Sequence, residues 1–158
     1  MQIVPRDVAL MGWILEQKFM DVRQIKRVFW KDNAAVSTEA YRRLGELEEQ
    51  GWLKKDDSYR FFLYLVTREG LKLLRCYGRD RGLSVVKEVD HSTFLHDFEV
   101  TNVRILFHEL GFTVWLSESY LSKFYGLRRL PDGMIFHQGK HVAIEYESTM
   151  KSKRRYAR

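Results

Sequence analysis

The spacing of apolar residues over the first thirty positions predicts two amphipathic helices. Pro5 is tolerated in a first helical turn, and the apolar residues after it recur at roughly helical spacing as far as Leu15. Asp21 is a second helix-start signal, because it precedes apolar residues that share one helical face as far as Phe29. The polar pair at positions 32–33 then ends this pattern.

A third helix is predicted over residues 37–50. Ser37 offers its N-cap, with Thr38 as the alternative register, and Gly51 closes the helix at its C-terminal end. The apolar residues of this helix repeat at i, i+4 and i+7: Ala40, Leu44 and Leu47. They predict one buried face and leave the opposite face to polar residues.

The next segment predicts a β-hairpin. A short strand at residues 52–53 and a polar turn at 54–58 precede residues 59–67, which are rich in aromatic and β-branched side chains. The order of three helices and a hairpin is that of a winged helix-turn-helix. The stretch from Tyr41 to Lys55, YRRLGELEEQGWLKK, resembles the third helix and first wing strand of many bacterial winged-helix proteins. This resemblance implies double-stranded DNA as the partner.

A recognition helix needs one apolar face against its own domain and one free face for the major groove. The residues that we expect to reach base edges lie near the N-terminal end of the free face: Thr38, Tyr41 and Arg42, with Gly45 beside them. Arg43 is better placed for phosphate, and three further cations flank the wing: Lys54, Lys55 and Arg60. The alternative is an ordinary solvated face, because acidic residues in the C-terminal half of the helix would repel phosphate.

One more amphipathic helix is predicted over residues 68–77. Thr67 is its expected N-cap, Gly70 is a weak point, and three residues are expected to point inward: Leu71, Leu74 and Cys76. Residues 78–82, GRDRG, have the composition of a linker. We therefore expect two domains, a winged helix over residues 1–80 and a second domain over residues 83–158.

The second half predicts an α/β layout with a mixed sheet. Its expected elements are a short strand at 85–86, a helix over 91–110, strands at 112–116, 134–136 and 142–147, and a final basic helix. Residues 118–124 favour neither helix nor strand. The predicted fold class is thus α+β, a winged helix-turn-helix followed by a small α/β domain. Because the chain ends barely one turn into the last helix, a truncated second domain is one expectation.

Carboxylates at two predicted strands suggest a metal site. Asp132 opens one strand, and Glu145 and Glu147 point to the same face of the next, because strand side chains alternate with a period of two. Hard Mg²⁺ takes oxygen ligands, so these three residues are candidate metal ligands and catalytic residues. "PDG" followed by "IEYES…K" resembles the PD-(D/E)xK nuclease pattern. Glu147 stands where that pattern has its lysine, and Lys151 is the candidate replacement.

The chain as a whole resembles the replication-relaxation family of bacterial and plasmid proteins. Besides the predicted winged helix, the resemblance rests on four motifs: HDFEVTNVRI (96–105), WLSE (115–118), PDG (131–133) and IEYE…K (144–151). It implies a DNA-associated role in the maintenance of plasmids or mobile elements. It also implies a restriction-endonuclease-like second domain, which is either active or an inactive scaffold.

Composition and charge narrow the class of protein. The net charge of +6, from 27 basic and 21 acidic residues, is compatible with a nucleic-acid partner but is modest. The single cysteine, Cys76, excludes a disulfide framework and a zinc site built on four cysteines. No apolar run reaches the ~18 residues of a membrane span, and no signal-peptide pattern opens the chain. We therefore expect a cytoplasmic protein with no membrane partner.

Three functions follow from these patterns. The first is a DNA-binding regulator of transcription or of plasmid replication, with a homodimer as the expected assembly. The second is a Mg²⁺-dependent endonuclease or nickase that uses Asp132, Glu145 and Glu147. The third is a protein-interaction adaptor without DNA affinity. The histidines are weak candidates for metal ligands, and His96 is expected to form a helix-opening hydrogen-bond pair with Asp97.

Overall fold

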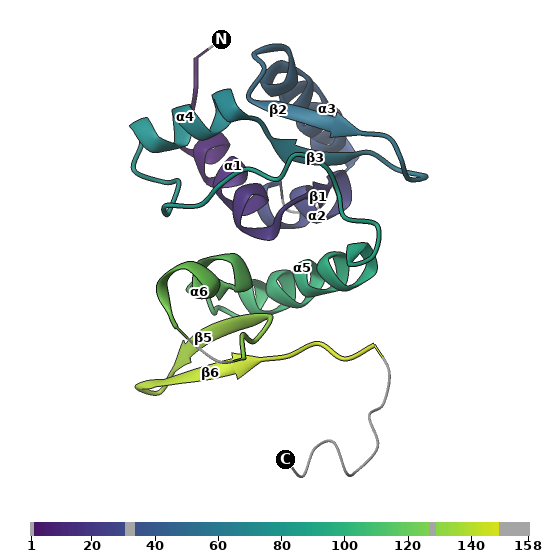
Figure 1. Cartoon of the computed structure of the whole chain (residues 1–158). Coiled ribbons are helices and arrows are strands. Elements are labelled where there is room, and N and C mark those ends of the chain that lie inside the picture. Colours follow the sequence, from purple (N-terminus) through teal and green to yellow (C-terminus); the bar gives the residue numbers. More distant parts are fainter. Residues whose placement is uncertain (1, 31–33, 127–128, 149–158) are drawn as a thin grey trace.

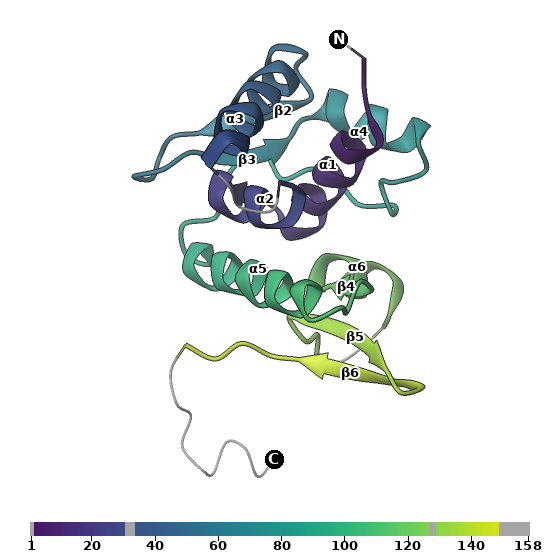
Figure 2. The same cartoon turned by 180° about the vertical axis from the view of Figure 1, so that it is seen from behind.

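A computed structural model describes residues 2–30, 34–126 and 129–148, with only the backbone described at 34–37. Within these ranges the fold is α+β, with six helices and two three-stranded antiparallel sheets. Figures 1 and 2 show three levels: helices α1–α4 with the first sheet, then α5 and α6, then the β5–β6 hairpin. Helix α5 therefore lies between the two sheets.

The first part of the chain has the predicted order of helices and hairpin, with one added strand. Its elements are α1 (Pro5–Gln17), β1 (Met20–Asp21), α2 (Val22–Phe29), α3 (Ala34–Glu49), β2 (Leu53–Asp56), β3 (Leu63–Val66) and α4 (Arg68–Cys76). Both β1 and β2 pair antiparallel with β3, in the order β1-β3-β2. The predicted strand over 59–67 is shorter than expected. Helix α3 begins at Ala34, so Ser37 lies inside the helix and is not its N-cap.

Side-chain and backbone caps explain where two of these helices begin and end. The Asp21 carboxylate accepts a hydrogen bond from the Gln24 backbone N–H at 2.8 Å, which confirms the predicted start of α2. Gly51 has φ +71°, and the Trp52 N–H donates to the Leu47 carbonyl at 3.0 Å. This is the geometry of a helix end that glycine adopts without steric cost.

The core of the first part is formed by the apolar faces of the helices and the sheet. The residues that are fully buried in it include Leu10, Met11, Ile14, Ile25, Ala40, Leu44, Leu47 and Leu74. Gly70 of α4 lies in close contact with the backbone at Trp52. A Cβ at this position would lie 2.2 Å from the Trp52 carbonyl oxygen. The glycine is therefore required by close packing. Cys76, expected to point inward, is exposed.

The second part is a helix packed on an antiparallel sheet. Its elements are α5 (Phe94–Glu109), β4 (Trp115–Ser117), α6 (Glu118–Phe124), β5 (Gly133–His137) and β6 (Lys140–Ile144). The strand order is β4-β5-β6 and both pairings are antiparallel, so the expectation of a mixed sheet is wrong. Residues 85–86 form no strand, and residues 118–124 are helical. The expected basic helix lies outside the described residues.

Helix α5 joins the two parts. Ile105 is fully buried in the core of the first part, while Val100 packs with Trp115 and Ile135 of the second sheet. Polar contacts add to this packing: Gln17 Nε2 donates to Thr101 Oγ1 at 3.2 Å, and Gln24 Nε2 donates to Asn102 Oδ1 at 2.9 Å. The segment 78–82, expected to be a linker, thus joins two parts that share buried residues.

Candidate functional site

Helix α3 has one buried face and one uncovered face. Ala40, Leu44 and Leu47 are fully buried on one side. Four residues follow the spacing i, i+3, i+4 and i+7 on the other side: Thr38, Tyr41, Arg42 and Gly45. Thr38 is exposed, Tyr41 is 51% exposed and the Arg42 side chain is 62% exposed. Figures 1 and 2 show α3 at the end of the molecule opposite β5 and β6, so the second part leaves this face open.

Gly45 stands in the middle of this uncovered face. A Cβ at this position would meet no heavy atom within 4 Å among the described residues. Packing inside the protein therefore does not require this glycine, although glycine in a helix interior costs about 0.5–1 kcal/mol relative to alanine. Another molecule could therefore approach the helix backbone closely at Gly45.

Arg42 keeps its guanidinium in the solvent next to an acidic neighbour. It forms an ion pair with Glu46, one helical turn further along α3. A hydrogen bond from Arg43, together with the charge of Arg42, holds the pKa of Glu46 below its usual range despite the opposing effect of burial. Surface pairs of this kind contribute little to stability, so another partner can replace Glu46 at low cost.

Arg43 is not available for the phosphate contact that the sequence suggested. It is only 9% exposed, and its guanidinium donates to the carboxylate of Asp7, with Nε 2.9 Å from Oδ1. It also donates to the Gln2 carbonyl at 2.8 Å. The physical reason lies in the helical period, because Arg43 is three residues from Ala40 and four from Leu47, on the apolar face. Arg43 therefore fixes α3 to α1.

The three predicted wing cations have different surroundings. Lys54 Nζ donates to the Lys87 carbonyl, and Lys55 Nζ lies 3.0 Å from the Glu48 carboxylate. Arg60, in the loop between β2 and β3, is exposed and makes no hydrogen bond or ion pair with any other described residue. Of these three cations, Lys54 and Lys55 thus have partners, and Arg60 has none among the described residues.

The predicted carboxylate site is built around Asp132, which has two partners in the structure. Its Oδ1 lies 2.8 Å from His96 Nε2, and its Oδ2 accepts a hydrogen bond from the Tyr146 backbone N–H at 2.6 Å. His96 does not form the expected pair with Asp97, which instead accepts from Thr93 and Lys18. The sequence contains no signal for the His96–Asp132 contact, because the two residues are 36 positions apart.

The other predicted residues of that site follow Ile144 in the chain: Glu145, Glu147 and Lys151. Strand β6 ends at Ile144, so Glu145 and Glu147 follow it, and both side chains are exposed. Among the described residues there is no group of three or more His, Cys, Asp or Glu side chains that could hold a metal ion. Lys151 lies outside the described residues.

Comparison with protein-family models, curated proteins and solved structures finds no match to this chain. In the part of the chain that the structure describes, no helix combines the length and the apolar character needed to cross a membrane.

Proposed function

We propose that this protein binds double-stranded DNA through the uncovered face of α3, with the β2–β3 hairpin as the wing of a winged helix. The observation that supports this proposal most directly is the division of α3 into two faces. The buried face and the Arg43–Asp7 pair hold the helix rigidly, while Thr38, Tyr41 and Arg42 remain exposed near its N-terminal end. A helix that binds in the major groove needs one face packed against its own domain and one exposed face that can contact DNA.

The residue types on the uncovered face suit a duplex. Arginine can donate two hydrogen bonds to guanine, and the hydroxyl groups of threonine and tyrosine can bond to bases or phosphates. Gly45 would allow the helix backbone to approach the DNA backbone closely, since no side chain projects there. Arg60 and Lys55 of the hairpin would contact phosphates beside the groove.

Anisotropy of a fluorescein-labelled duplex, measured across a range of salt concentrations, tests this proposal. Phosphate contacts from Lys54, Lys55 and Arg60 would give a slope of log K against log [salt] of about −2.7, at roughly 0.9 for each neutralised phosphate. Arg60→Ala should weaken binding and make this slope shallower, and Arg42→Ala should weaken binding through the loss of a base contact. The matched control is Arg68→Ala, at the start of α4, which is also exposed and follows the end of β3 opposite the hairpin loop.

Two results would contradict the proposal. If the wild type, Arg42→Ala and Arg68→Ala all bound the duplex equally weakly, α3 would not be part of the DNA-binding surface. Absence of salt-sensitive binding would favour the adaptor function. The resemblance to the replication-relaxation family stays a prediction, and it would assign the DNA binding to a regulator of transcription or plasmid replication.

A further inference from the structure

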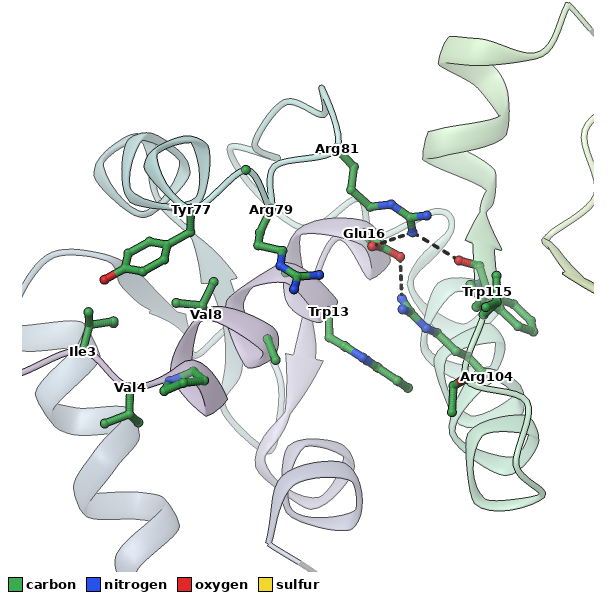
Figure 3. A pocket seen from close by; sticks show the side chains of 16 residues that line it. Ile3, Val4, Val8, Trp13, Glu16, Tyr77, Arg79, Arg81, Arg104 and Trp115 are labelled. Atoms are coloured by element: carbon green, nitrogen blue, oxygen red, sulfur yellow. Dashed lines mark hydrogen bonds and ion pairs between the residues drawn. The ribbon is translucent and has the colours of Figure 1, made fainter.

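A cavity of about 690 Å³ lies between α1, the segment after α4, and the start of β4. Figure 3 shows its two unlike ends. One end is apolar and is lined by Ile3, Val4 and Val8. The other end is charged and is lined by Glu16, Arg79, Arg81 and Arg104. The cavity is thus large enough for a small molecule with one apolar and one polar part.

The charged end has more positive than negative charge. Arg81 Nη1 donates to Glu16 Oε1 at 2.9 Å, and Arg104 Nη1 lies 3.0 Å from Glu16 Oε2, so two arginines share one carboxylate. Burial lowers the pKa of Arg104 to about 10, although Glu16 opposes this effect. At neutral pH both guanidinium groups are charged. With Arg79, the four charged residues that line the cavity have a net charge of +2.

Arg79 is the member of this group that has no anionic partner. Its side chain makes no hydrogen bond or ion pair with any other described residue. In Figure 3 it reaches between the apolar end and the Glu16–Arg81–Arg104 group. An anion placed there would meet Arg79 directly and would have apolar side chains on the other side.

We propose that this cavity binds a small organic anion, with its carboxylate or phosphate group on Arg79 and its apolar body against Ile3, Val4 and Val8. The proposal does not depend on DNA binding, because the cavity lies on α1 and β4 and not on the uncovered face of α3. A charge-assisted hydrogen bond from arginine is stronger than a neutral one and favours an anion over a neutral molecule of the same shape.

Naphthalene-2-carboxylate and its neutral isostere naphthalene-2-carboxamide test the proposal on the full chain. Titration by calorimetry and by amide chemical shifts should show saturable binding of the carboxylate, with shifts at Gly12, Gly78 and Thr113, which line the cavity. The carboxamide should bind at least about tenfold more weakly, which is the low end of the contribution of a hydrogen bond to a charged group. Inorganic phosphate alone, compared at the same concentrations, shows whether the apolar body is needed.

Two variants and one control locate the site. Arg79→Gln should reduce carboxylate affinity to that of the carboxamide, while Arg68→Gln, an exposed arginine outside the cavity lining, should leave it unchanged. Gly12→Leu should block both probes, because its side chain would extend into the cavity from α1. Circular dichroism checks that each variant folds. If Gly12→Leu does not fold, the carboxylate affinity of Arg79→Gln tests the proposal by itself. No saturable binding, equal binding of the two probes, or an unchanged Arg79→Gln would overturn the proposal.

Discussion

The Arg43–Asp7 pair provides the sharpest test of how α3 is held. Asp7 is fully buried at the start of α1, and its carboxylate also accepts a hydrogen bond from the Val4 backbone N–H at 2.8 Å. Arg43→Ala would remove two charge-assisted hydrogen bonds and leave the carboxylate with this single donor. Each such bond contributes about 1.5–3 kcal/mol, and loss of one partner of a buried pair costs about 3–5 kcal/mol.

We expect Arg43→Ala to lower the free energy of unfolding by about 3–5 kcal/mol, a large share of the ~5–15 kcal/mol of a typical domain. Urea denaturation followed by tryptophan fluorescence measures this loss. With a slope of about 2 kcal/mol per molar urea, the midpoint should fall by about 1.5–2.5 M.

The adjacent residue provides the matched control. Arg42→Ala removes the same charge from a neighbouring, exposed position and should change stability little. The double variant Asp7→Asn/Arg43→Met should lose less than the sum of its single variants, because no buried charge is left alone. If Arg43→Ala were as stable as Arg42→Ala, Arg43 would be a surface cation and the assignment of α3 would need revision.

Further predictions concern two glycines, a lysine and the carboxylate site. Gly45→Ala should raise the free energy of unfolding by about 0.5–1 kcal/mol, and should weaken duplex binding if DNA approaches there. Gly70→Ala should lower stability by about 1–3 kcal/mol because its Cβ meets the Trp52 carbonyl; calorimetric melting distinguishes the two. Burial lowers the pKa of Lys18, but the hydrogen bond and charge of Asp97, with Glu118, outweigh it and raise that pKa. The stability difference between the wild type and Lys18→Met should therefore be fully present below pH about 10.4 and disappear as pH rises through the raised pKa; a constant difference at alkaline pH would refute this. Mg²⁺-dependent cleavage of plasmid DNA, if present, should be lost in Asp132→Ala, and its survival in that variant would exclude the predicted nuclease site.

Apolar periodicity was sufficient to predict the helices of the first part. Positions 40, 44 and 47 determine which face of α3 is buried, and Asp21 marks the start of α2 as expected. Strand β1 was missed because two residues, Met20 and Asp21, have no detectable period. The antiparallel order of β4-β5-β6 depends on pairings between separate segments, which local patterns do not specify.

The candidate site was predictable only in part. The exposure of Tyr41 and Arg42 follows from the helical period, and the same period indicates that Arg43 lies on the buried face. Its partner Asp7 is 36 residues away, as Asp132 is from His96, so neither contact has a local signal. The cavity is likewise formed by segments that are distant in sequence.

The position of α5 has a consequence for how the molecule unfolds. Ile105 of α5 completes the core beside α1, and Val100 of the same helix is one of the three buried residues that form the core of the second sheet, so the second half depends on α5 for its core and the first half is partly covered by it. A fragment ending near residue 82 would expose the apolar surface that Ile105 covers and would be prone to aggregate. The chain should accordingly melt in one cooperative transition, and a movement of the second sheet would be transmitted to the helices above it.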